Sequence, residues 1–171
     1  KIFRHKIGTS TKNDILIFEE KTKAFTVGIG LSSDEKYYFI NSSDHNTSEK
    51  YYFSVTEETP KPTLIKAREK GIIYHVNSWD GYFYIHTNKN AEDFKIERTK
   101  NITSSNWEAY VPAKEETLIG GLLFLNNWTI HSEVTNALDK IFVRNIKTNK
   151  EEELIFTDEK VYDAGVSLKQ R

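Results

Sequence analysis

The chain has 171 residues and an almost balanced charge, with 24 lysines and arginines against 25 aspartates and glutamates. This length suits one domain, and the balance excludes the basic footprint that is typical of nucleic-acid-binding proteins. The absence of cysteine excludes disulfide bonds and thiolate metal sites. No stretch reaches the roughly 18 apolar residues of a membrane span, and no apolar signal core is present, so we expect a cytoplasmic protein without a membrane partner.

The N-terminal residues alternate between side-chain types at the period of a strand. Residues 1–20 predict two short strands around the turn cluster Gly8–Asn13, and we interpret them as the end of one repeating unit. Residues 25–67 follow as a complete four-stranded unit. Its first strand carries Gly28 and Gly30, and this spacing predicts the close approach of a neighbouring backbone.

Two further units and a fragment complete the chain. Residues 71–111 contain the dipeptide Asp80-Gly81 between two aromatic and β-branched runs, which indicates a hairpin. Residues 117–157 repeat the four-strand pattern. Residues 161–168 predict the first strand of another unit that the chain does not complete, and no segment predicts a helix.

A strand pair recurs four times in the sequence, and its last copy combines residues 140–146 with residues 152–156. The second strands of these pairs recur at steps of roughly 45 to 49 residues, the length of a four-stranded propeller blade. Such a unit cannot bury its apolar face alone, so neighbouring units must stack. The sequence therefore predicts an all-β fold, a β-propeller segment of four-stranded antiparallel blades with about three complete blades and partial ones.

A search for catalytic and metal-binding patterns finds no convincing site. The sequence has no Gly-x-Ser-x-Gly turn, no phosphate-binding glycine loop and no His-Glu-x-x-His motif. Ser42, Asp44 and His45 lie together, but triad residues normally converge from separate loops, so we interpret them as a polar loop. The five histidines lack ligand spacing with a carboxylate, which favours structural roles and predicts no metal or other cofactor.

The opening segment carries a resemblance to a known family. Lys1–Thr9 followed by Asp14–Glu20 resembles the His-x-Leu-Gly-Thr…Asp-x-Leu-x-Tyr-Glu-Glu segment in the propeller domain of the prolyl oligopeptidase family, and the most similar branch is oligopeptidase B (protease II). Further matches follow in the family's order over essentially the whole chain, at Leu31–Asp34, Thr47–Glu49, His86–Lys89, Asp93–Phe94, Trp107 and Val111–Pro112.

This resemblance implies one part of a two-part serine peptidase. Family members combine a seven-bladed propeller, which restricts access to short peptides, with an α/β-hydrolase domain that carries Ser, Asp and His. Oligopeptidase B members cleave after Arg or Lys. The chain matches only about half of such a propeller, so the resemblance supplies no catalytic residue. We expect the chain to be inactive alone and to need the peptidase domain as its partner.

The same resemblance suggests which residues face the substrate. Inner strands and their loops face the channel and the peptidase domain in this family. Loop positions of this chain that could lie there are Asp44, His45, Asn77, Trp79, Asp80 and Asn88.

The residues also leave other interpretations open. The chain could be a stand-alone interaction module that closes as a homodimer, because the strand edges at residues 1–7 and 161–168 have no neighbours in the sequence pattern. A carbohydrate- or nucleic-acid-binding β-domain has only the aromatic residues in its favour, and without a basic groove these favour packing between blades. Since the chain has no methionine and begins in the middle of a blade, we expect it to be a piece of a longer protein.

Overall fold

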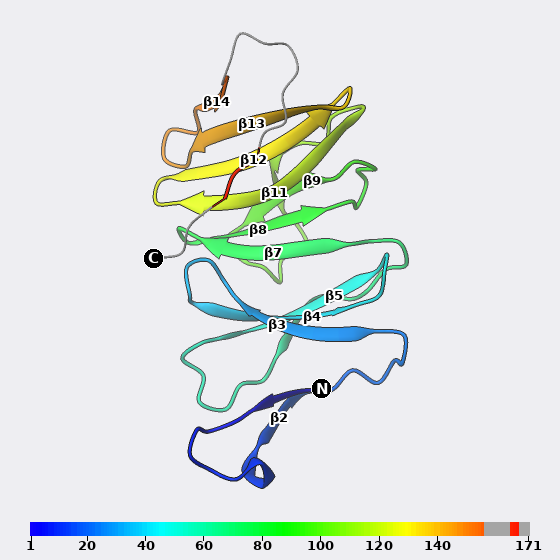
Figure 1. Ribbon diagram of the computed structural model, residues 1–171, viewed down its shortest axis with the longest axis vertical. Helices are drawn as coiled ribbons and strands as arrows, with labels where there is room; N and C mark the ends of the chain where they lie inside the picture. The colour runs from blue at the N-terminus through cyan, green and yellow to red at the C-terminus, as the bar shows by residue number, and fades with distance from the viewer. Residues whose placement is uncertain (156–164, 168–171) are drawn as a thin grey trace. The chain divides into compact units, whose positions relative to one another are not determined.

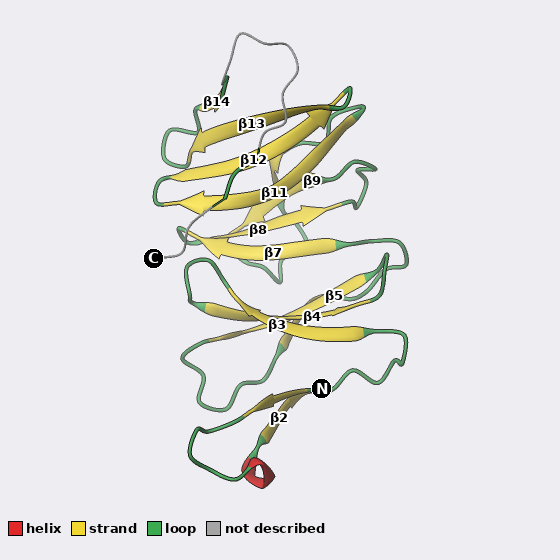
Figure 2. Cartoon of the chain, in the orientation of Figure 1, coloured by secondary structure: helices red, strands yellow, loops and turns green. Residues whose placement is uncertain are grey.

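The computed structural model describes residues 1–155 and 165–167, and these residues form an all-β structure (Figures 1 and 2). The strands are arranged in three four-stranded sheets and one two-stranded sheet. The predicted fold class, with about three complete units and partial ones, is thereby confirmed. The helical element in the described part is η1 (Thr11–Asn13), a single 3-10 turn. No helix among the described residues has the length and apolar composition to cross a membrane.

Each sheet follows the chain in order. The two-stranded sheet contains β1 (Ile2–Arg4) and β2 (Ile15–Phe18). The next sheet contains β3 (Thr26–Leu31), β4 (Tyr37–Ser43), β5 (Ser48–Ser54) and β6 (Thr63–Lys66). The third contains β7 (Tyr74–Trp79), β8 (Tyr82–Thr87), β9 (Lys95–Thr99) and β10 (Glu108–Val111). The last contains β11 (Thr117–Leu125), β12 (Trp128–Thr135), β13 (Leu138–Asn145) and β14 (Glu151–Glu153).

Short turns produce much of this local topology, because strands that are joined by two to five residues pair as hairpins. Such turns join β3 to β4, β4 to β5, β7 to β8, and the four strands β11 to β14 in succession. The turn between β7 and β8 consists of Asp80 and Gly81, whose φ angles are 49° and 78°. Both angles lie in the left-handed region that Asp-Gly turns adopt, so the predicted hairpin is confirmed. The turn between β11 and β12 has Asn126 at a φ of 42°.

The chain divides into two compact units. The first unit comprises Lys1–Ile85 and Arg98–Trp107, and the second comprises His86–Glu97 and the residues from Glu108 onward. The division runs through β8 and β9, so the chain passes between the units more than once.

Aromatic rings dominate the core of the first unit. The ring of Phe83, which is 7% exposed, lies 5.0 Å from Tyr37, 6.1 Å from Tyr52 and 6.4 Å from Phe39, measured between centroids. Tilted and edge-to-face pairs at such distances are favourable beyond the burial of area alone. The other buried members of this cluster are Ile65, Tyr74, Ile85 and Ile102.

The second unit has a more aliphatic interior, and its inner strand β11 needs a glycine. The register between β11 and β12 shifts between Ile119 and Leu122. A Cβ at Gly120 would lie 2.3 Å from the hydroxyl oxygen of Ser132 and 3.1 Å from its carbonyl oxygen. The close approach predicted for Gly28 and Gly30 is not found, because a Cβ at either would meet no described atom within 4 Å.

The strand predicted at residues 161–168 lies largely outside the described residues. Residues 165–167 are described and have no regular secondary structure. The trailing strand therefore stays a prediction.

Candidate functional site

Asp44 and His45 lie in the turn that connects β4 to β5. The carboxylate of Asp44 accepts hydrogen bonds from the backbone N–H groups of Asn46 and Thr47, at 3.0 and 2.8 Å. The bond from Asn46, with help from Thr47, lowers the pKa of Asp44 because it stabilises the charged form. His45 is exposed. Asp44 therefore holds the turn, and His45 is the member of this pair that is open to solvent.

Asn77 holds the end of β7 to the turn that connects β3 to β4. Its side-chain oxygen accepts a bond from the backbone N–H of Ser33 at 2.8 Å, and its amide donates to the Ser33 hydroxyl at 2.8 Å. Beside it, the hydroxyl of Ser78 donates to the carboxylate of Asp34 at 2.9 Å. Four polar side chains thus join two sheets of the first unit, and Asn77 is one of them.

The remaining predicted positions lie in two other turns. Trp79 ends β7 and is half-buried, and Asp80 is exposed at the tip of the hairpin. Asn88 follows β8 and accepts a backbone bond from Ala91 at 3.1 Å. Asn88 belongs to the second unit, whereas the other five belong to the first. The six positions lie on three segments of the chain: the β4–β5 turn, the end of β7 with its hairpin turn, and the β8–β9 connection. Their role in facing a substrate stays a prediction.

A carboxylate–arginine cluster, which the sequence analysis missed, lies in the first unit. The guanidinium of Arg68 donates to Glu20 at 2.6 Å and to Glu49 at 3.0 Å, and the two carboxylate side chains are only 8% and 9% exposed. The Ser42 hydroxyl donates to Glu20 at 2.6 Å, and the Tyr51 hydroxyl donates to Glu49 at 2.7 Å. Sequence separations of 19 and 48 residues leave no local signal for this cluster.

The pKa values of this cluster follow from burial and its hydrogen bonds. Burial opposes the ionisation of Glu20, but the bonds from Ser42, from a backbone N–H and from Arg68 outweigh it and lower the pKa to about 2. The pKa of Glu49 is lowered in the same way, because the bonds from Arg68 and Tyr51 outweigh its burial. Burial and the Glu49 carboxylate raise the pKa of Tyr51 to about 12. At neutral pH the two glutamates are therefore ionised, Arg68 is protonated and Tyr51 is neutral.

Lys50 is a buried lysine next to this cluster. It is 6% exposed, and its ammonium donates to the side-chain oxygen of Asn41 at 2.7 Å. Burial lowers the pKa of Lys50 to about 8, because a charged amine is disfavoured in a weakly polar surrounding. Its side chain is directed to Asn41 on the neighbouring strand β4, and Lys50 lies opposite Asn41 in the register of β4 and β5.

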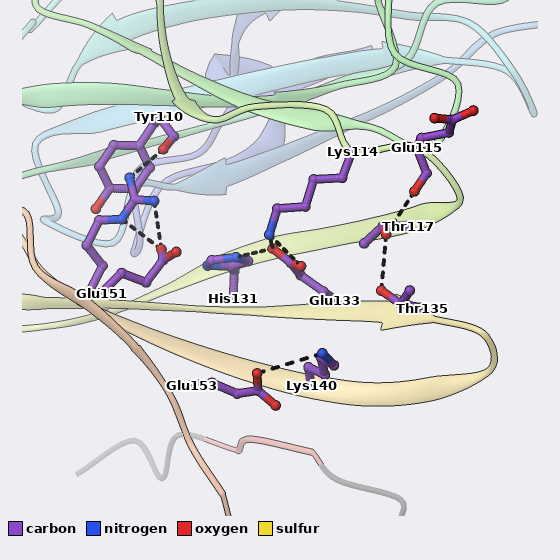
Figure 3. A network of polar contacts seen from close by, with 11 residues as sticks. Tyr110, Lys114, Glu115, Thr117, His131, Glu133, Thr135, Lys140, Glu151 and Glu153 are labelled. Carbon is purple, nitrogen blue, oxygen red and sulfur yellow. Dashed lines mark hydrogen bonds and ion pairs between the residues drawn. The ribbon is translucent and has the colours of Figure 1, made fainter.

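The second unit contains a network of charged groups around His131 (Figure 3). Thr129, His131 and Glu133 alternate along β12, and all three are buried on the same face. The Nε2 atom of His131 lies 3.1 Å from a carboxylate oxygen of Glu133. The ammonium of Lys114, from the connection between β10 and β11, donates to both Glu133 oxygens at 2.5 and 2.7 Å. The i, i+2 spacing of His131 and Glu133 in an apolar strand was the sequence signal for this pair.

A second ion pair lies on the outer strands of the same sheet. The guanidinium of Arg144 on β13 binds the carboxylate of Glu151 on β14 at 2.7 and 2.8 Å. It also donates to the backbone carbonyl of Tyr110 on β10 and lies 4.4 Å from the centroid of that ring. The Tyr110 hydroxyl is 2.7 Å from the hydroxyl of Thr129. These contacts join β10 to the last sheet.

Two histidine–carboxylate pairs among the described residues, His5 with Asp14 and His131 with Glu133, do not form a nucleophilic site. His5 and Asp14 lie 2.6 Å apart on the connection between β1 and β2, and His131 pairs with Glu133. In the part that the structure describes, no serine or threonine hydroxyl contacts either imidazole, and a nucleophile must lie within hydrogen-bond reach of its base. No group of three histidine, aspartate or glutamate side chains in that part is suited to a metal ion.

A hollow of about 440 Å³ lies beside the β1–β2 connection. It is lined by Arg4, His5, Lys6, Thr9, Asn13 and Ile15. Its composition is basic, but the Arg4 guanidinium already donates to the carbonyl of Glu58, and His5 is paired with Asp14. Lys6 is then the one cation of this lining without a described partner, and a single exposed lysine does not make an anion-binding site.

The whole chain matches a known family. The model for the prolyl oligopeptidase N-terminal β-propeller domain covers residues 1–171. Protease 2 of Moraxella lacunata is 32% identical over 133 residues, which are 71% of this chain and 19% of that protein. Dipeptidyl aminopeptidase BI of Pseudoxanthomonas mexicana is 26% identical over 170 residues, 98% of this chain and 23% of that protein. The chain thus spans about a fifth to a quarter of these relatives.

Solved structures share the fold. Oligopeptidase B from Trypanosoma brucei, determined with covalently bound antipain, superposes with a TM-score of 0.82 at 23% identity, over 93% of this chain and 24% of that one. Oligopeptidase B from Leishmania major superposes with a TM-score of 0.81 at 18% identity, over 91% of this chain and 23% of that one. The propeller fold and the resemblance described from the sequence are both confirmed.

Proposed function

This chain belongs to the family of prolyl oligopeptidase N-terminal β-propeller domains, and on that premise we propose that it forms part of a propeller that covers the active site of a serine peptidase domain. In this role the blades admit short peptides and exclude longer polypeptides, whether folded or unfolded. The cleavage itself belongs to a peptidase domain, which is the proposed partner of this chain. The observation that carries the proposal is the family match over residues 1–171.

The three four-stranded sheets support this role. A gate of this kind needs stiff walls, because a flexible barrier would admit larger substrates. Two kinds of contact hold the sheets of the first unit together. Asn77 forms hydrogen bonds to Ser33, and Phe83 belongs to the aromatic cluster. Such packing suits a wall rather than a catalytic surface.

We further propose that the complete protein cleaves after Arg or Lys. The basis is the resemblance to the oligopeptidase B branch together with the similarity to Protease 2. We retain the six predicted substrate-facing residues as part of the proposal. His45 and Asp80 are the exposed members of this set. A cytoplasmic location remains a prediction.

A chimera tests the gate. In Protease 2 of Moraxella lacunata, the matching 133-residue segment is replaced by the corresponding residues of this chain. We expect the chimera to cleave a chromogenic dipeptide after Arg at a rate similar to that of the parent and to leave unfolded casein intact. A folded chimera that degrades casein as readily as the dipeptide would falsify the gating role. Gel filtration and circular dichroism establish folding, and a shorter exchange of residues 117–155 alone is the alternative if the larger one does not fold.

The preference for Arg or Lys needs a separate test. The complete protein that contains this chain is assayed on four dipeptide substrates that end in Arg, Lys, Pro or Ala before the scissile bond. Arg and Lys substrates should be hydrolysed at least about tenfold faster, since a paired charge in a specificity pocket contributes roughly 1.4 kcal/mol or more. Faster hydrolysis after Pro would contradict the proposed specificity and leave the propeller role untouched.

The open edge of β1 keeps the homodimer as the second candidate. Among the residues that the structure describes, β1 pairs with β2 alone, and an unpaired strand edge can recruit another strand. Light scattering over a dilution series, with and without residues 161–171, decides this point. A dimer that is lost on deletion supports closure between two copies. A monomer at all concentrations, or a dimer that survives the deletion, rules this mode of closure out.

A further inference from the structure

His131 has a buried nitrogen without a hydrogen-bond partner. Its side chain is 1% exposed, and its Nδ1 atom has no partner among the described residues. The Nε2 atom faces the carboxylate of Glu133, which can only accept when it is ionised. The neutral imidazole must therefore carry its proton on Nε2, and Nδ1 presents a buried lone pair.

The charges around His131 are already balanced. On its own strand lies Glu133, which Lys114 from the β10–β11 connection neutralises. Strands β13 and β14 contribute two ion pairs. Arg144 pairs with Glu151, and the Nζ atom of Lys140 lies 3.8 Å from a carboxylate oxygen of Glu153. The ring of Phe142 stacks on the imidazole of His131, with 5.2 Å between the centroids. The ammonium of Lys114 lies 5.0 Å from the centroid of the Phe142 ring. These elements contribute three cations and three anions.

A proton on His131 would disturb this balance in two ways. It would add one uncompensated positive charge to a buried cluster, beside the ammonium of Lys114. It would also turn Nδ1 into a buried donor without an acceptor, which costs about as much as a lost hydrogen bond or more. The carboxylates of Glu133 and Glu151 favour the proton, but burial outweighs them, and the pKa of His131 is lowered.

We propose that His131 is an acid sensor, and that its protonation loosens the contact between the β10–β11 connection and β12. The connection is the element that can yield, because β12 is paired on both sides by β11 and β13. Lys114 is 41% exposed, so its ammonium can return to water when the charge on His131 repels it. The second unit would then be rigid at neutral pH and open locally in weak acid. This inference does not depend on the proposed function.

The sign of the effect follows from linkage. A histidine whose pKa is lowered on folding contributes stability above the unfolded-state pKa of about 6.5, and this contribution is lost as the pH falls towards the folded-state value. At pH 5.5 the unfolding equilibrium constant should rise by up to about tenfold through this group alone. His86, the other histidine of the unit, is half-buried and acts in the same direction, because burial also lowers its pKa.

The test compares the full chain with its His131→Gln variant at pH 7.5 and 5.5. Glutamine keeps a donor for Glu133 and does not titrate. Hydrogen exchange of residues 111–118, corrected for intrinsic rates, should accelerate up to about tenfold more in the parent than in the variant at pH 5.5. A His86→Gln variant measures the share of the second histidine, and His45→Gln, at an exposed position, is the matched control. Equal acid acceleration in the parent and in His131→Gln would overturn the proposal.

A second measurement needs no variant. The imidazole titration of His131 is followed by NMR in the parent chain. We expect His131 to remain neutral, as the Nε2-H tautomer, at pH values just below about 6.5, the ordinary pKa of histidine. A titration of His131 at or above about pH 6.5 would overturn the proposal even if the variant does not fold.

Discussion

The two units of this protein differ in the ionisable groups that they bury. The first unit buries a carboxylate–arginine cluster, with Arg68 between Glu20 and Glu49. The second unit also buries a carboxylate, Glu133, which pairs with Lys114, but beside it lies the buried imidazole of His131, whose pKa is lowered by burial. The half-buried imidazole of His86, in the same unit, lies 2.8 Å from the carbonyl oxygen of Ile119, whereas the histidines of the first unit are exposed.

This difference predicts that the two units respond to acid in sequence. The pKa values of the carboxylates in the first unit are lowered on folding, to about 2 for Glu20. Their stabilisation is present above the unfolded-state pKa of about 4.3 and is lost only as the pH falls towards the folded value. The histidines of the second unit lose theirs from about pH 6.5 downward. The second unit should therefore loosen first.

The largest effect is expected from the aromatic core of the first unit. Phe83→Ala removes the ring that Tyr37, Phe39 and Tyr52 surround, and it should lower the free energy of unfolding by about 3–5 kcal/mol, the usual cost for a buried phenylalanine. Urea denaturation at pH 7.5 measures it. Leu64→Ala, at a residue that is 39% exposed, is the control and should cost less than about 1 kcal/mol. If both variants lose the same amount, the aromatic cluster does not hold the unit together.

Removal of the central cation should reverse the order of the acid response. Arg68→Met leaves Glu20 and Glu49 buried without a cation and should cost about 3 kcal/mol at neutral pH. The pKa values of both carboxylates should rise, so that the first unit begins to unfold at a higher pH than in the parent. Hydrogen exchange between pH 7 and 4 follows both units at once. Arg4→Met is the matched control, because the exposed Arg4 binds a backbone carbonyl and no carboxylate. An unchanged acid transition in Arg68→Met would contradict the role of the cluster.

The smallest effect is a gain. Lys50 has a hydrogen bond to Asn41 but no ion pair among the described residues, and its lowered pKa of about 8 indicates a cost of burying the charge. Lys50→Met should stabilise the first unit by about 1 kcal/mol at pH 7. The free-energy cost of burying the charged amine is fully present below about pH 8 and decreases as the pH rises towards 10.5. In that range Lys50 has lost its proton in the folded chain but not in the unfolded chain. Thermal unfolding at pH 7 and 9.5 should show a gain that shrinks with pH. A loss of stability, with the exposed Lys36→Met unchanged, would show that the hydrogen bond to Asn41 outweighs the burial.

The fold could be predicted from the sequence because its signals are local. The alternation of side-chain types within each strand and the Asp80-Gly81 turn each depend on residues a few positions apart, and they predict strands and turns without knowledge of the tertiary partners. The repetition of these local patterns along the chain then predicts the four-stranded units. The resemblance of the segments 1–9 and 14–20 to the propeller family depends on such local order as well. Local signals fail where a partner comes from another sheet. Gly28 and Gly30 looked like sites of close approach, but the crowded glycine is Gly120, opposite Ser132.

The candidate sites illustrate the same limit. Asp44 and Asn77 were predicted as polar loop residues that face a substrate, and the structure gives each of them a role in holding a turn. Nothing in the sequence distinguishes a carboxylate that binds its own turn from one that is open to a ligand.

By itself the sequence determined that this chain is an all-β propeller segment of four-stranded units, because strand alternation and turn residues act within a few positions. The tertiary structure alone decided which charged side chains are buried and which residues they pair with. Arg68 meets Glu20 across 48 residues, and Lys114 meets Glu133 across 19. The physical reason is that the free energy of a buried charge depends on its solvent exposure and on the atoms within a few ångströms, and these are set by the packing of strands from different parts of the chain.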